Sequence, residues 1–170
     1  MKRLIALVAA IMLIAGCLAA CSDTGTGTAD ANSGDAANTS DSVQLSTLLD
    51  KINDKYSLSG LKVLEKASDL DRYYTISESD VKQFAAELTT AASQYSEVIV
   101  IEAASTDSAD AVKAKLNSHL DAQLSTAKSY DQDAVAMIES CKVEQIGDFV
   151  YLVIGENASD IGQTIRDFIQ

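Results

Sequence analysis

Two side chains in the interior of the chain could support nucleophilic or metal chemistry. His119 is the only histidine, and catalytic pairs or zinc sites require partners that do not cluster around it in the sequence. Cys141 has no Cys/His signature nearby, and a buried thiol behaves as a small apolar side chain unless its pKa is lowered. We therefore expect His119 at the solvent boundary of its helix and Cys141 in a packing role, without a structural disulfide.

Acidic residues form three short patterns that resemble known sites. Asp69 with Asp71, and Asp131 with Asp133, alternate as calcium ligands do, but neither continues into the full EF-hand loop. Asp23-Thr24-Gly25 matches the aspartic-protease triplet, but it lacks flanking apolar strands and a second carboxylate. No Gly-x-Ser-x-Gly elbow and no Gly-rich phosphate loop occurs in the sequence. The sequence predicts no catalytic residue, no metal site and no cofactor.

A further residue that could carry chemistry is Cys21, which lies where an apolar stretch of sequence ends and a polar stretch begins. Leu18-Ala19-Ala20-Cys21 resembles a bacterial lipobox, whose cysteine receives a diacylglyceryl thioether before cleavage. The large Leu18 at position −3 argues against an ordinary secretory cleavage site. Cys17 also fits the motif and stays an alternative, but Ser22-Asp23 gives Cys21 the more hydrophilic start. We expect a lipid on Cys21, and two acyl chains would anchor the protein stably.

The segments around this cysteine set the domain organisation. Residues 1–20 have a basic start, an apolar stretch and small residues before the cysteine, as in a lipoprotein signal peptide. Residues 21–42 lack large apolar side chains after the cysteine, and this composition predicts a flexible polar linker. Residues 43–170 suit a single domain. This order predicts a cell-membrane protein, lipid-anchored on the extracytoplasmic face.

The charge of the chain excludes one class of partner. The formal net charge is −12, and loss of Lys2 and Arg3 with the leader leaves 11 basic against 25 acidic residues. Phosphate backbones repel such a surface, and the aromatic content is only 5% with no Trp. We expect no nucleic-acid partner.

The apolar periodicity of the last 128 residues predicts alternating helices and hairpins. The segment from Leu61 to Tyr74 is ambiguous between a short helix and irregular structure. Glu97 to Ala103 is the clearest strand, and its four consecutive β-branched residues favour a central place with both faces covered. The expected helices are 45–55, 107–129, 133–140 and one over 159–169; the expected strands are 84–88, 97–103, 141–146 and 149–154.

This order predicts an α+β domain. About four antiparallel strands would form two hairpins, one across Thr89 to Ser96 and one across Gly147-Asp148. The helices would pack on one face of that sheet.

Four segments combine core and turn residues, namely Tyr73-Tyr74-Thr75-Ile76, Glu97-Val98-Ile99-Val100-Ile101, Ser129-Tyr130-Asp131 and Gly147-Asp148-Phe149-Val150-Tyr151-Leu152. Together they resemble an uncharacterised lipoprotein family of Gram-positive bacteria, the domain of unknown function DUF4358. The resemblance covers about residues 44 to 169, although the Pro expected after the long helix is replaced by Asp131-Gln132. It implies a cellular location and a domain length, and it assigns no activity or catalytic residue.

The sequence therefore favours a non-catalytic binding or interaction domain, held at the membrane by its covalent lipid, with an unknown protein or envelope ligand. Two alternatives stay open. One is a cell-envelope hydrolase that uses acidic residues, and the other is an accessory subunit of an envelope or transport complex.

Overall fold

The structure is a computed structural model that describes residues 43–91 and 94–170. The expected signal peptide, the linker and the two candidate lipidation sites, Cys17 and Cys21, lie outside the described residues. So does the Asp23-Thr24-Gly25 triplet.

Helices and strands alternate along the described chain. In chain order they are α1 (Leu45–Tyr56), β1 (Leu61–Val63), α2 (Ala67–Tyr74), the 3-10 turn η1 (Glu78–Asp80), β2 (Val81–Thr89), β3 (Glu97–Ala103), α3 (Thr106–Tyr130), α4 (Gln132–Ser140), β4 (Val143–Ile146), β5 (Phe149–Ile154) and α5 (Ala158–Ile169).

The strands form one antiparallel sheet in the order β1-β2-β3-β5-β4. The α+β class, both expected hairpins and the central place of β3 are confirmed. The sheet has five strands rather than four, because β1 adds to the edge of β2, where Leu61 lies opposite Thr89. Gly147 closes the β4–β5 hairpin with a φ of 57°, as the first position of a tight hairpin turn requires.

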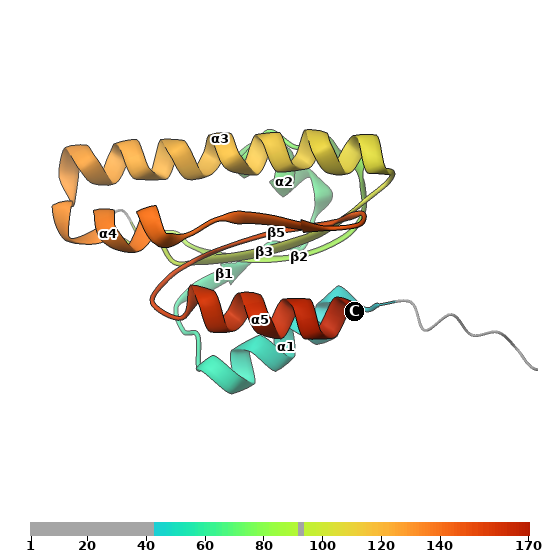
Figure 1. Cartoon of the computed structure of the whole chain (residues 1–170), viewed down its shortest axis with the longest axis horizontal. Coiled ribbons are helices and arrows are strands. Elements are labelled where there is room, and N and C mark those ends of the chain that lie inside the picture. The colour runs from blue at the N-terminus through green and yellow to red at the C-terminus, as the bar shows by residue number, and fades with distance from the viewer. Residues whose placement is uncertain (1–42, 92–93) are drawn as a thin grey trace, which may run out of the picture. The chain divides into compact units, whose positions relative to one another are not determined.

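The helices, expected on one face, cover both faces of the sheet (Figure 1). Helices α2, α3 and α4 pack on the first face, and α1 and α5 pack on the second. Side chains alternate along β3, so that Ile99 and Ile101 belong to the first hydrophobic cluster while Val98 and Val100 belong to the second. Burial of both faces explains why residues 98–101 of β3 are four apolar residues in a row.

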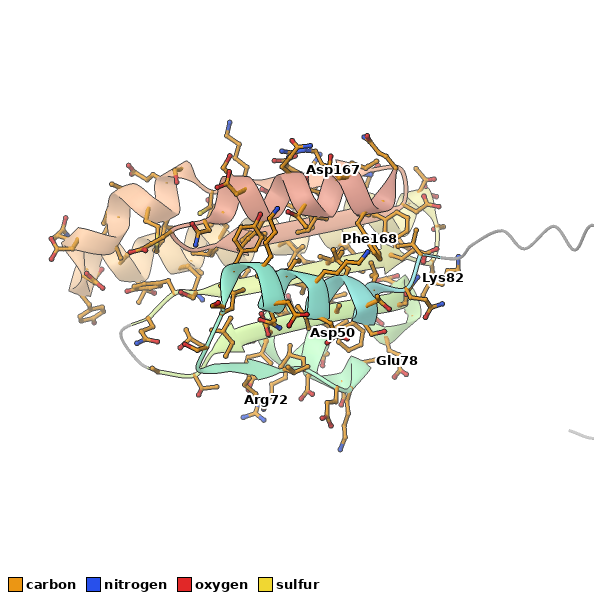
Figure 2. The ribbon with its side chains drawn as sticks, turned by 90° about the horizontal axis from the view of Figure 1, so that it is seen from below. Asp50, Arg72, Glu78, Lys82, Asp167 and Phe168 are labelled. Atoms are coloured by element: carbon orange, nitrogen blue, oxygen red, sulfur yellow. The ribbon has the colours of Figure 1, made fainter. Side chains whose placement is uncertain are left out.

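Helices α1 and α5 also contact each other on the second face (Figure 2). The Tyr56 hydroxyl donates to the carbonyl of Asp160 over 2.8 Å, and Lys51 lies 4.5 Å from the centre of the Phe168 ring. The first and last helices thus form one layer of the domain together.

Candidate functional site

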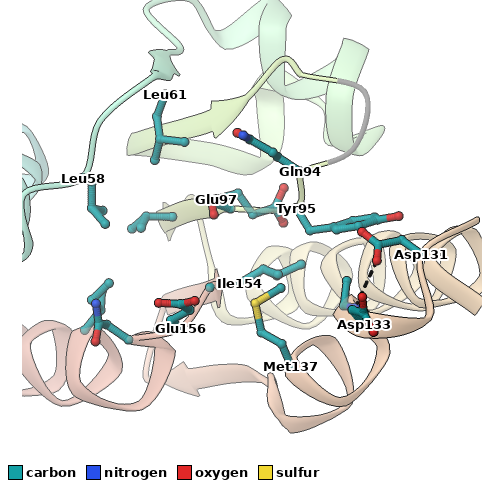
Figure 3. Close-up of a pocket in the computed structure, with 16 residues that line it drawn as sticks. Leu58, Leu61, Gln94, Tyr95, Glu97, Asp131, Asp133, Met137, Ile154 and Glu156 are labelled. Carbon is teal, nitrogen blue, oxygen red and sulfur yellow. Dashed lines mark hydrogen bonds between the residues drawn. The ribbon is translucent and has the colours of Figure 1, made fainter.

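A pocket of about 480 Å³ lies where β3 begins and β5 ends; we call it the end-of-sheet pocket (Figure 3). Its walls come from segments far apart in the chain. The α1–β1 connection contributes Leu58, the start of β3 contributes Glu97, α4 contributes Met137 and α5 contributes Ile161. The site therefore exists only in the folded domain.

Apolar side chains line two sides of the end-of-sheet pocket. Figure 3 shows Leu58 and Leu61 on one side and Ile154 and Met137 on the other. Ile154 is buried, whereas Leu58, Leu61 and Met137 are half-buried, so that these three side chains keep part of their surface accessible. An apolar group could lie between the two sides.

Carboxylates form much of the polar lining. Asp131, Asp133 and Glu156 line the pocket together with Glu97. Asp131 also caps α4, because its side chain accepts a hydrogen bond from the Ala134 backbone N–H at 3.3 Å. The cap fixes the direction of Asp131 at one border of the pocket.

Glu97 is the buried carboxylate of this site. It lies opposite Leu88 in β2 and Ile154 in β5, and its side chain is only 4% exposed. One oxygen, Oε2, lies 3.0 Å from Nε2 of His119, while the other, Oε1, is buried without a hydrogen-bond partner among the described residues. A buried, half-satisfied carboxylate is costly for the fold, and such groups are often retained for function.

His119 connects Glu97 to the first hydrophobic cluster. Its side chain is 16% exposed, which agrees with the expected boundary position on α3. The ring centroid lies 4.7 Å from that of Tyr74. The Tyr74 hydroxyl is buried without a hydrogen-bond partner in the described part of the chain, and burial together with the nearby charge of Glu97 raises the pKa of Tyr74.

A second cavity of about 430 Å³ lies on the α3 side of Glu97; we call it the helix-side pocket. Gln94, Tyr95 and Glu97 line both pockets, while His119 and Gln123 line only the helix-side pocket. Glu97 therefore stands in the wall that separates the two cavities.

A polar cluster of Glu144, Tyr151 and Arg166 holds α5 against the sheet. The Tyr151 hydroxyl donates to Oε2 of Glu144 at 2.7 Å, and Arg166 donates to the same oxygen at 2.8 Å. Burial and the Glu144 carboxylate raise the pKa of Tyr151 to about 12. Burial would raise the pKa of Glu144, but the bonds from Tyr151 and Arg166 outweigh it and lower this pKa. The lowered pKa of Glu144 keeps its ion pair with Arg166 charged, which indicates a structural role for this cluster.

Cys141 lies where the packing interpretation places it. It is 6% exposed, and its thiol donates to the carbonyl of Met137 at 3.3 Å. Burial is the main cause that raises the pKa of this thiol. A thiol kept protonated is a poor nucleophile, so the structure gives Cys141 no feature of a reactive site.

The two alternating acid pairs do not come together. Asp69 lies in the first turn of α2 and Asp131 caps α4. Within residues 43–91 and 94–170, no group of three or more His, Cys, Asp or Glu side chains is placed to hold a metal ion.

Sequence reasoning missed Glu97 as a site residue because it reads as the polar start of an apolar strand. The contact that gives it a role, with His119, joins residues 22 positions apart. Glu87, in the interior of β2, was also missed, because its burial and its contact with Asn53 of α1 join residues 34 positions apart. It is 3% exposed on the second face, accepts a hydrogen bond from Asn53 at 3.1 Å, and has a pKa that burial raises.

The fold and the pockets define a small α+β domain with a ligand-sized cavity at the end of its sheet. A family model for a domain of unknown function, DUF4358, matches residues 54–155, and the chain belongs to this family. The match is shorter than the expected 44 to 169, and it leaves out α5 and most of α1, the two helices of the second face. No curated protein and no solved structure shows a significant similarity to the chain.

The described residues contain no helix that is both long enough and apolar enough to cross a membrane.

Proposed function

We propose that this protein is a lipid-anchored binding protein on the extracytoplasmic face of the cell membrane. Cys21, with Cys17 as the alternative, carries the lipid, and residues 21–42 tether the domain. The domain binds its ligand in the end-of-sheet pocket without transforming it.

One observation carries the binding role, namely the composition of that pocket. Its volume of about 480 Å³ falls in the range of small-molecule sites, which combine apolar walls with a few polar groups. The two side chains most capable of catalysis, His119 and Cys141, are not among the described residues that line it. These features favour recognition over reaction.

A specific contact supports a second candidate, a cell-envelope hydrolase. The pair of His119 and Glu97, 3.0 Å apart, has the arrangement of a general base held by a carboxylate. In such an enzyme the helix-side pocket would be the active site, and His119→Ala would abolish turnover of envelope substrates. A binding protein would show no turnover before or after this substitution.

The accessory-subunit alternative has less support. It calls for a broad apolar surface, and the exposed large hydrophobic side chains of the described residues are Val63 on β1 and Tyr130 at the end of α3.

Mass spectrometry of the mature protein from its native membrane tests the anchor. We expect a diacylglyceryl group on Cys21 as the first residue, and Cys21→Ala should release the protein from the membrane or leave the leader uncleaved. An unmodified first residue, or a mature chain found in the cytosol, would contradict the anchor.

A pocket-filling variant tests the binding site. Ala134 lines the end-of-sheet pocket on α4, so Ala134→Leu should narrow it, while Ala114→Leu on the exposed side of α3 is the matched control. We expect saturation-transfer NMR of 3-phenylpropanol, with the mature protein in nanodiscs and empty nanodiscs subtracted, to lose its signal only in Ala134→Leu. Equal signals in both variants would refute this site.

A further inference from the structure

The charged groups of the end-of-sheet pocket all have one sign. Four of its lining residues are carboxylates, and none of the described residues that line it is Lys, Arg or His. Figure 3 shows Glu156 on one side of Met137 and Asp133 on the other. A ligand that enters the pocket therefore meets negative charge on both sides of an apolar surface.

The Lys and Arg residues of the described chain leave three of these carboxylates, Asp131, Asp133 and Glu156, without an ion pair, while Glu97 lies beside His119. The ion pairs with Lys or Arg among the described residues are Lys82–Glu102, Lys128–Glu139 and Arg166–Glu144. None of these pairs involves Asp131, Asp133 or Glu156.

The buried member of these four carboxylates, Glu97, is only half-satisfied within the described part of the chain. Glu97 lines the same pocket, is 4% exposed at its side chain, and keeps Oε1 buried without a hydrogen-bond partner in the described part of the chain. An acceptor in this state is satisfied by a ligand that brings an N–H or O–H donor. An ammonium or guanidinium group brings several donors and a positive charge.

The apolar walls exclude a bare metal ion as the best occupant. Leu58, Leu61, Met137 and Ile154 are apolar residues that line the pocket together with the carboxylates. The carboxylates are spread around these side chains, and no three of the described acidic, His or Cys residues are close enough to share a metal ion. The fitting ligand has an apolar body as well as a charge.

From these observations we infer that the ligand of the end-of-sheet pocket is an amphipathic organic cation, with an ammonium or guanidinium group on an apolar body. This inference rests on the proposed binding function. The apolar body lies between Leu58 and Met137, and the cationic group lies toward the carboxylates. The excess of acidic residues in the mature chain, 25 against 11 basic ones, attracts cations and repels anions.

Three probes that share one apolar body and differ in charge test this inference. They are 3-phenylpropylamine, 3-phenylpropanol and 3-phenylpropanoate, titrated against the mature protein in zwitterionic nanodiscs, with empty nanodiscs subtracted. We expect the amine to bind about tenfold more tightly than the alcohol, because two or three partly exposed carboxylates each contribute a modest attraction. The propanoate should bind most weakly of the three, and 0.5 M NaCl should reduce the preference for the amine to within about threefold.

A charge-matched pair of variants places the effect in the pocket. Asp133→Asn with Glu156→Gln should remove most of the preference for the amine, while Asp50→Asn with Asp54→Asn, which changes two exposed acids of α1, should keep it. Circular dichroism of both variants confirms that each is folded.

The outcomes separate the ligand class from the binding site. If the alcohol or the propanoate binds as tightly as the amine, or if no probe binds, the cationic ligand is refuted. Preference for the amine that persists in Asp133→Asn with Glu156→Gln also refutes it. If Ala134→Leu leaves the binding of all three probes unchanged, the pocket itself is refuted, and the proposed function falls with it.

Discussion

Replacement of Ile165 by Ala tests the most consequential feature of the fold, the cover that α5 gives to the second face of the sheet. Ile165 is fully buried, at 0% exposure, in the cluster that includes Val98 and Val100. The change removes three carbon atoms, worth about 2.4 kcal/mol in transfer free energy, and it adds a cavity term. We expect the free energy of unfolding to fall by about 3 kcal/mol.

Urea denaturation followed by circular dichroism measures this loss, and thermal denaturation should show a Tm lower by roughly 10 °C for a domain of this size. Leu116→Ala, fully buried on the first face, should cost a similar amount. Asp167→Ala on the exposed side of α5 (Figure 2) should change the free energy by less than about 0.5 kcal/mol. A loss below about 1 kcal/mol for Ile165→Ala, with an unchanged m-value, would refute the packing of α5 on the sheet.

Three further predictions follow from single buried or strained positions. Burial raises the folded-state pKa of Glu87, so the folded protein binds this proton more tightly than the unfolded chain does. The free energy of unfolding should therefore fall as pH rises from about 4.3 through the folded pKa, and Glu87→Gln should lack this fall. Parallel curves of stability against pH for the two proteins between pH 4 and 7 would contradict this prediction. Cys141, buried and with a raised pKa, should react with a thiol reagent in urea many times faster than in buffer, and equal rates would show that its burial is wrong. Gly147→Ala, at a φ of 57°, should lower the free energy of unfolding by about 1 kcal/mol, whereas an unchanged or higher value would mean that the turn tolerates a side chain.

The sequence predicted the elements that depend on neighbouring residues. The strand from Glu97 to Ala103 was placed at its observed bounds because four β-branched residues stand in a row. The hairpin at Gly147 was found from its turn residues. Strand β1 was missed because three residues are too few for a period, and pairing with β2 alone makes them a strand.

The layer arrangement depended on information that no local pattern contains. An apolar stripe predicts that one side of a helix is buried against the sheet, but it does not indicate which face of the sheet the helix covers. The family match over residues 54–155 contains α2, α3 and α4, which lie together on the first face. The flanking helices α1 and α5 reach the second face, because the path of the chain around the sheet places them there.

By itself, the sequence determined the acidic charge, the identity of the elements other than β1 and α2, and the boundary and packing roles of His119 and Cys141, because each depends on composition or on residues close in the chain. Only the tertiary structure determined which residues form the candidate site. Glu97 and His119 meet across 22 residues, and the end-of-sheet pocket takes walls from Leu58 to Ile161. Folding removes Glu97 from water and leaves one of its oxygens without a partner, and burial of this kind arises only where distant segments pack together.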